Sequence, residues 1–197
     1  MKNKDYHDID LKEVHKDLKL NLKKKRYVHT LGVEFTAAAL AMRYGEDIFK
    51  AQLAGALHDQ AKYVEDEKML SICKKNKLSV SNVEKRNPYL LHGKVGALWA
   101  KEKYGIEDED ILNAITYHTT GRPGMGLLEK IVFIADYIEP SRDKAPNLEE
   151  IRRLSFENID RAVIRVLEDT IKHLKEGSGE MDDMTLKTYE YYVGKSL

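Results

Sequence analysis

The sequence has little cysteine, no excess of either charge and no long apolar run, and each absence excludes a class of structure or partner. The single cysteine, Cys73, cannot form a disulfide within the chain. The 33 Lys and Arg residues balance the 33 Asp and Glu residues, so no global field favours nucleic acid or an anionic membrane surface. No apolar run approaches the roughly 20 residues of a membrane-spanning helix. We therefore expect a soluble protein without a nucleic-acid or membrane partner, which binds anions only locally.

The length and the polar N-terminus predict one cytoplasmic domain. The first ten residues carry both charge signs and no apolar signal core, so a cytoplasmic location is expected. A compact chain of 197 residues can bury roughly 70% of its unfolded surface around one core. No Ser/Gly-rich linker or internal repeat divides the sequence. The prediction is a single domain over residues 1–197, with its motifs between about 26 and 140 and additional helices at both ends.

Apolar residues recur in steps of three and four, which predicts an all-α fold. One such stripe precedes Gly45, a suitable helix C-cap, and consists of Val28, Leu31, Phe35, Ala38 and Met42. Further helical stripes are expected over about 46–57, 88–105, 111–121 and 128–138, and one long segment over 151–174. No segment shows the sustained alternation of a strand.

Four residues on separate apolar segments predict a metal site. His29 lies beside the stripe just described, so it should be at least half buried. The pair His58-Asp59 ends an Ala/Leu-rich helix, and Asp136 interrupts an almost entirely apolar helix. An unpaired buried carboxylate costs several kcal/mol, so Asp136 needs a cation or strong hydrogen bonds. One divalent ion bound by all four residues would satisfy them together, and this N/O donor set suits Fe, Mn, Co or Zn.

Other polar residues near these positions point to an anionic substrate. His92 and His118 adjoin small residues and fit either a second metal or direct phosphate contacts; both alternatives remain open. Basic side chains that can bind phosphate follow or precede the four residues along the chain, namely Arg26, Lys62, Arg122 and Arg142. Taken singly, each histidine is more often a core residue and Asp136 could pair with an arginine. The conjunction on separate apolar helices favours a metal.

The arrangement of His29, His58-Asp59 and Asp136 resembles the H…HD…D signature of the HD-domain superfamily of metal-dependent phosphohydrolases. Longer strings narrow the resemblance to its YqeK-type branch, the symmetrical bis(5'-nucleosyl)-tetraphosphatases. These strings are RYVHTLG from Arg26, AGALHD from Ala54, LLHG from Leu90, HTTGRP from His118 and ADYIEP from Ala135. The resemblance extends from about residue 26 to about residue 174. Within it, Val28, Gln60, Lys94, Gly126 and Ser141 depart from the expected pattern.

The resemblance implies a fold, a reaction and a set of roles. Members of that branch are described as helical HD-domain bundles that split diadenosine tetraphosphate into two ADP molecules with iron or a similar metal. By this resemblance the metal ligands are His29, His58, Asp59 and Asp136, one or two ions are expected, and manganese, cobalt or zinc are alternatives to iron. The substrate contacts would be Arg26, Lys62, Arg122, Tyr137 and Arg142. The catalytic groups would be Asp59, Lys62, His92 and His118, the two histidines serving a second metal or the phosphates.

Three other functions compete with this interpretation. The chain could be another HD phosphohydrolase that acts on a nucleotide monophosphate, a dNTP or a guanosine alarmone. It could also be a nucleotide-sensing module without turnover, although an intact ligand set speaks against lost catalysis. A helical protein whose histidines only pack is the third. The cluster of Tyr189, Tyr191 and Tyr192 would either dock on the core or form a homodimer contact.

Overall fold

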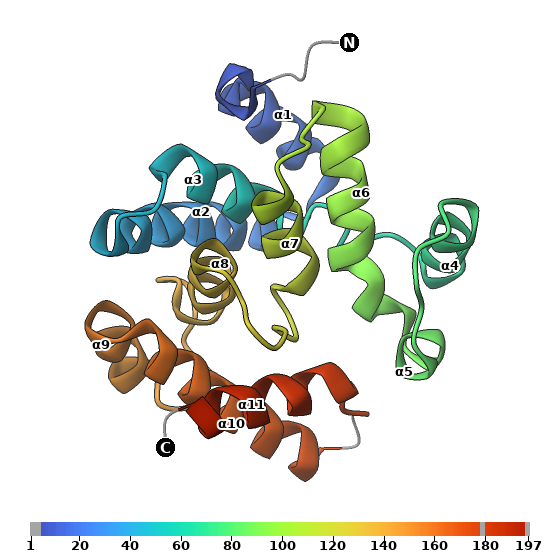
Figure 1. Ribbon diagram of the computed structural model, residues 1–197. Coiled ribbons are helices and arrows are strands. Elements are labelled where there is room, and N and C mark those ends of the chain that lie inside the picture. The colour runs from blue at the N-terminus through green and yellow to red at the C-terminus, as the bar shows by residue number, and fades with distance from the viewer. Residues whose placement is uncertain (1–4, 178–179, 196–197) are drawn as a thin grey trace.

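A computed structural model describes residues 5–177 and 180–195 as helices joined by short connections (Figure 1). No strand occurs in this part of the chain, so the predicted all-α fold is confirmed. The elements are η1 (Tyr6–Asp8), α1 (Leu11–Asn21), α2 (Lys24–Tyr44), α3 (Ile48–Leu57), α4 (Asp66–Lys75), α5 (Asn82–Arg86), η2 (Pro88–Leu91), α6 (His92–Tyr104), α7 (Glu109–Tyr117), α8 (Leu127–Ile138), α9 (Leu148–Glu157), α10 (Ile159–Glu176) and α11 (Asp183–Lys195).

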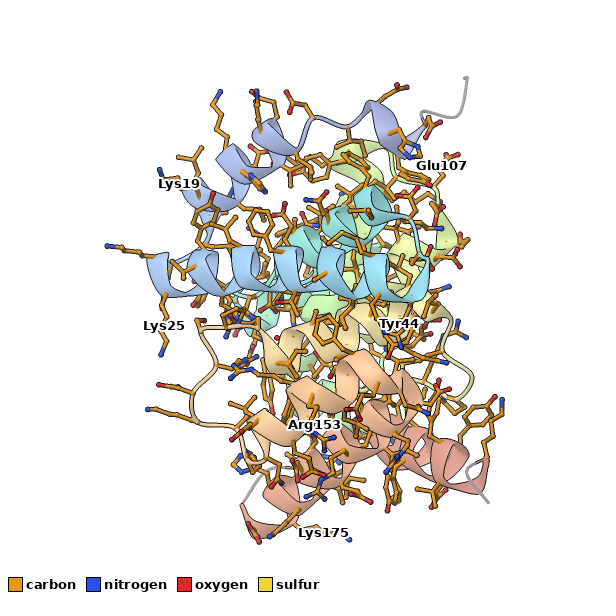
Figure 2. All side chains as sticks on the ribbon, turned by 90° about the vertical axis from the view of Figure 1, so that its left-hand side faces the viewer. Lys19, Lys25, Tyr44, Glu107, Arg153 and Lys175 are labelled. Carbon is orange, nitrogen blue, oxygen red and sulfur yellow. The ribbon has the colours of Figure 1, made fainter. Side chains whose placement is uncertain are left out.

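The centre of the molecule is formed by α2, α3, α7 and α8. Helix α2 packs on α3 and α8, and α7 packs on α6 and α8. Figure 1 shows α7 and α8 between α1 and α11, which lie at opposite ends of the molecule. In Figure 2, α2 crosses the middle of the view from Lys25 to Tyr44, with Lys19 of α1 on one side and Arg153 of α9 on the other.

The ends of the central helices follow from local chemistry. Gly45 ends α2 and Gly105 ends α6, both in the left-handed conformation (φ 75° and 72°) that glycine adopts without steric cost. Asp47 caps α3 by accepting a hydrogen bond from the amide of Lys50 at 2.8 Å. These caps were predicted within a residue or two, because the signals lie in the sequence next to the helix ends.

The predicted long segment over residues 151–174 is wrong, because the structure divides it into α9 and α10. Asn158 has extended backbone angles (φ −152°, ψ 103°) between the two helices. Its amide closes α9 on the carbonyl of Leu154, and its side chain accepts from the amide of Arg161 at 3.0 Å to begin α10. The asparagine side chain forms hydrogen bonds with backbone groups that would otherwise continue the helix. Because the apolar residues keep a helical spacing on both sides of Asn158, the periodicity does not reveal the interruption.

Most of the stripe that predicted α2 does not face the core. Three of its five members are exposed, with Val28 at 49%, Phe35 at 61% and Met42 at 64% of their free accessibility. The buried face shares only Ala38 with the stripe and consists of His29, Thr30, Val33, Glu34, Ala37, Ala38, Leu40 and Ala41. This face allows α3 to approach closely: a Cβ on Gly55 would lie 3.0 Å from the Cα of Glu34. Because α2 and α3 pack closely, the face of α2 with smaller side chains is buried, and the larger side chains that gave the apolar periodicity remain exposed.

Both terminal helices dock on the rest of the molecule. Helix α1 buries Val14 and Leu18, and α11 buries Tyr192 at 4% exposure against the main apolar cluster. A smaller cluster under α4 includes Cys73, which is fully buried. Among the described helices, none has the length and apolar character that spanning a membrane requires.

Candidate metal centre

Six predicted residues from five helical segments converge at the centre of the molecule. His29 comes from α2 and Asp136 from α8. The others lie at helix ends: His58 follows α3 and is succeeded by Asp59, His92 begins α6, and His118 follows α7. Ligand atoms from these residues form three overlapping groups, each within 4.8 Å, and the groups are His29–His58–Asp59, His58–His118–Asp136 and Asp59–His92–His118. The structure therefore brings together all residues predicted to bind one or two ions.

The four imidazoles all turn Nε2 toward this centre. In three of them Nδ1 bonds to a backbone carbonyl three residues earlier, at 2.6 to 2.7 Å: His58 to Gly55, His92 to Tyr89 and His118 to Ile115. In His29, Nδ1 lies 2.9 Å from Oε1 of Glu139. A carbonyl or carboxylate oxygen only accepts, so Nδ1 carries the proton in each neutral ring. Each Nε2 is then an unprotonated donor atom, as a metal ligand must be.

Three buried atoms at the centre lack a hydrogen bond within the described part of the chain. They are Nε2 of His29, Nε2 of His58 and Oδ1 of Asp59. Nε2 of His29 also lies 3.0 Å from Oδ1 of Asp136, so a bare nitrogen faces a carboxylate. Buried polar atoms are rarely left without a partner, and electron pairs at this distance repel unless a cation lies nearby. The residues fit a divalent ion.

Asp59 lies between two pairs of imidazoles. Its Oδ2 is 3.3 Å from Nε2 of His58 and 3.9 Å from Nε2 of His29. Its Oδ1 is 3.2 Å from Nε2 of His92 and 3.7 Å from Nε2 of His118. The two oxygens thus face two separate pairs of imidazole nitrogens.

The protonation states suit metal binding. Burial lowers the pKa of His92 to about 4, so its ring is neutral near pH 7. Burial by itself raises the pKa of Asp136, but the charge of Arg142, which donates to its Oδ1, opposes that effect, and the pKa is held below its usual range. His92 is therefore a neutral donor and Asp136 an ionised one at physiological pH.

Three cationic side chains surround the acidic groups. Arg26 donates to Oδ2 of Asp59 at 2.8 Å, and Arg142 donates to Oδ1 of Asp136 at 2.8 Å. Nζ of Lys62 lies 3.1 Å from Nε2 of His92 and 3.5 Å from Oδ1 of Asp59. These three groups were predicted as substrate contacts, and the structure places all three at the rim of the centre.

Residues 26–141 match the HD domain family model. The chain belongs to the HD-domain family. Membership in this family implies dependence on a divalent metal, and the histidine and aspartate cluster supplies suitable donors. The predicted family is confirmed, together with the helical HD-domain fold.

Relatives of this HD-domain chain include bacterial enzymes named bis(5'-nucleosyl)-tetraphosphatase, symmetrical. The protein of Bacillus subtilis strain 168 is 41% identical over 91% of this chain and 95% of its own length. That of Halalkalibacterium halodurans is 44% identical over 87% of this chain and 91% of its own length. A crystal structure from Clostridium acetobutylicum, described as a predicted HD superfamily hydrolase involved in NAD metabolism, covers 95% of this chain and 98% of that one, with 42% identity and a TM-score of 0.91.

A cavity of about 310 Å³ adjoins the HD centre at His29. Four cationic side chains line it, namely Lys25, Arg26, Arg142 and Lys144. Its acidic side chains are Asp143 and Glu139, and Glu139 already pairs with His29. Lys25, Lys144 and the lining ring of Tyr63 had not been singled out in the sequence, because a lysine or tyrosine in a polar segment is usually a solvated surface residue. The cavity combines positive charge with access to a metal ligand.

Two predicted substrate contacts are engaged elsewhere. The guanidinium of Arg122 donates to both carboxylate oxygens of Glu129, at 2.6 and 2.8 Å. The hydroxyl of Tyr137 bonds at 3.3 Å to Asp169 and to the carbonyl of Pro146. The Nε and Nη2 atoms of Arg122 and the hydroxyl of Tyr137 are therefore committed to protein partners.

Two further residues touch the HD centre without having been predicted as site residues. The hydroxyl of Thr119 lies 3.1 Å from Nε2 of His118. Glu139 is buried and binds the imidazole of His29. Thr119 was visible as the neighbour of His118. Glu139 follows an apolar helix three residues after Asp136, so its burial was a detectable signal.

Proposed function

We propose that this HD-domain protein is a metal-dependent hydrolase that cleaves diadenosine tetraphosphate symmetrically into two ADP molecules. The observation that carries the proposal is the cluster of unpartnered, inward-facing imidazole and carboxylate donors beside a cavity lined by four cationic side chains. Such a site suits a polyanionic substrate whose phosphates approach a metal. Relatives at 38 to 44% identity that are named symmetrical tetraphosphatases support the choice among HD substrates.

We propose two metal positions, both completed by Asp59. His29, His58 and Asp136 would hold the first ion, and His92 with His118 the second. Nε2 of His92 lies 3.0 Å from Nε2 of His118, and both rings turn Nδ1 to a backbone carbonyl, so the two unprotonated nitrogens would offer one ion a pair of ligand atoms. Iron is the proposed metal because the mixed imidazole and carboxylate set suits it, with manganese, cobalt and zinc as alternatives.

The roles of the protein groups follow from their placement. When bound, the metal supplies Lewis acidity and a nucleophilic water of lowered pKa. Arg26, Lys62 and Arg142 would bind phosphate oxygens, orient an inner phosphorus at the centre and stabilise the charge that develops during cleavage. Asp59, His92 and His118 would hold the groups that surround that phosphorus in position. ADP leaves as a stable anion, so the reaction needs no dedicated general acid.

A product assay tests this function. Metal-loaded protein is incubated with diadenosine tetraphosphate, with a chelated sample in parallel, and the products are separated by ion-exchange chromatography. We expect ADP as the sole product and no cleavage after chelation. AMP with ATP would contradict symmetrical cleavage. Absence of cleavage would contradict the proposed substrate. Nucleotide monophosphates, dNTPs and guanosine alarmones would then be tested as substrates, and no turnover of any of them would favour the sensing function.

A further inference from the structure

His29 differs from the other three inward-facing histidines in what holds its ring. His58, His92 and His118 each use a carbonyl of their own helical turn. The Nδ1 of His29 instead contacts a carboxylate 110 residues later in the sequence, that of Glu139. The orientation of this one ring therefore depends on how α2 and the end of α8 pack together.

Glu139 is arranged as an acceptor through both of its oxygens. The residue is only 1% exposed. Oε1 accepts from Nδ1 of His29 at 2.9 Å and from the hydroxyl of Ser141 at 2.6 Å. Oε2 accepts from the backbone amide of Ser141 at 2.7 Å. Both oxygens are thus engaged as acceptors of hydrogen bonds, so the carboxylate offers His29 an acceptor and no donor.

Gly32 leaves the space that Glu139 occupies. It lies on α2 three residues after His29, and a Cβ built on it would clash with Oε2 of Glu139. Its backbone is helical, so the absence of a side chain here serves close approach rather than a special backbone conformation. Two independent features, the donors of Ser141 and the gap at Gly32, therefore place one carboxylate behind one imidazole.

We propose that Glu139 is a positioning residue that fixes the tautomer and orientation of His29, so that Nε2 is presented unprotonated to the metal. Ser141 and Gly32 hold Glu139 in place. The carboxylate also increases the basicity of the imidazole, as outer partners of metal-bound histidines do. This proposal rests on the metal centre alone and is independent of which nucleotide is cleaved.

Replacing the carboxylate by an amide should disturb this arrangement, because an amide has one donor and one acceptor end. In Glu139→Gln, an oxygen facing His29 would turn the NH₂ group toward the amide of Ser141, and two donors would meet. The opposite orientation would turn NH₂ toward Nδ1 of His29 and favour a proton on Nε2, where it blocks metal binding. Either orientation weakens the first metal position.

The test measures metal affinity without substrate. Co²⁺ binding to the metal-free protein is followed by equilibrium dialysis for the wild type and for Glu139→Gln. We expect the variant to bind Co²⁺ about 10- to 100-fold more weakly at the first position, the range found for outer partners of metal ligands. Ser141→Ala, which removes one of the three hydrogen bonds to Glu139, should show a smaller loss.

Glu34 offers a matched control. It is also 1% exposed, also lies on α2, and also bonds an imidazole, since its Oε2 lies 2.6 Å from Nε2 of His15. His15 is outside the metal centre. Glu34→Gln should therefore leave the Co²⁺ affinity unchanged, which separates the effect of a lost buried carboxylate from an effect transmitted through His29.

A measurement on the unmodified protein keeps the proposal testable even where Glu139→Gln folds poorly. The ¹⁵N chemical shifts of the histidine rings in the metal-free wild type, measured at alkaline pH where the rings are neutral, report which nitrogen carries the single proton, and loss of a signal in His29→Gln assigns the ring. We expect His29 to be protonated on Nδ1 alone. A proton on Nε2, or a folded Glu139→Gln with wild-type Co²⁺ affinity, would overturn the proposal. A negative result with diadenosine tetraphosphate would bear on the substrate and leave these readouts unchanged.

Discussion

At the residue scale, the centre depends on which nitrogen of each imidazole faces inward. Three of the rings are fixed within their own turn of chain by a carbonyl three residues earlier, so their orientation is a local property. Asp136 and His58 are polar groups on otherwise apolar helices, and each turns an atom toward the centre, where Nε2 of His58 lies 3.9 Å from Oδ1 of Asp136. Their presence is explained by the cation, so their removal should affect metal and activity together.

We expect Asp136→Ala and His58→Ala each to lose the metal of the first position together with turnover. Removing a direct ligand should weaken metal binding by more than the about 10- to 100-fold loss that follows removal of an outer partner. Metal content is measured by elemental analysis after gel filtration, and turnover by ADP release. Near-normal activity in either variant would contradict the ligand assignment.

The number of ions is decided by His92 and His118. With two positions, the wild type should contain two equivalents of metal, and His92→Ala or His118→Ala should contain one. With direct phosphate contacts instead, wild type and variants would all contain one equivalent, and the variants would show mainly a raised KM. Titration with Mn²⁺ distinguishes the two outcomes.

At the element scale, the second position depends on the approach of α6 to α7. Gly93, which follows His92, lies against the end of α7: a Cβ here would be 2.5 Å from the carbonyl oxygen of Thr116 and 3.0 Å from that of Ile115. Backbone atoms cannot move aside as a flexible side chain does. The small residue therefore sets the distance between the helices that carry His92 and His118.

Gly93→Ala should separate α6 from α7. We expect a loss of about 1–3 kcal/mol in the free energy of unfolding, the usual cost of overpacking, and a weakened second metal position. Gly194→Ala in α11 is the control, because a Cβ there meets nothing within 4 Å, and it should stabilise the helix by about 0.5–1 kcal/mol. Urea unfolding measures both, and equal stabilities of the two variants would contradict the close approach.

At the scale of the whole molecule, a metal at the proposed first position would join elements that are distant in sequence. The donors of the first position come from α2, the turn after α3 and α8, which pack on one another at the centre of the fold (Figure 1). A ligand that binds only the folded chain stabilises it by mass action. The bound metal should thus contribute to the stability of the entire molecule, not only to the site.

Chelation should lower the melting temperature of the metal-loaded protein by about 5–10 °C. This estimate takes a metal at 100 times its Kd, worth about 2.7 kcal/mol, and about 2–4 °C per kcal/mol for a protein of this size. Differential scanning fluorimetry measures the shift, and Mn²⁺ should reverse it. Asp136→Ala should show a smaller shift on chelation than the wild type, because only the second position remains; a shift as large as that of the wild type would place the stabilising metal elsewhere.

The sequence by itself determined most of the central helices and the set of residues that converge at the centre. Helix periodicity, the glycine after α2 and the caps of α3 act over a few residues, so they can be identified without a fold. Polar groups in apolar helices need a partner. Because the apolar neighbours are visible in the sequence, this requirement identified His29, the His58-Asp59 pair and Asp136.

Only the tertiary structure decided which faces and which distant residues meet. Packing against α3 selected the small-residue face of α2 and left Phe35 exposed. Pairing with Glu129 engaged Arg122, and the contact between α2 and the end of α8 placed Glu139 behind His29. These choices depend on close packing and on contacts across as many as 110 residues, for which a periodic pattern in a single helix carries no information.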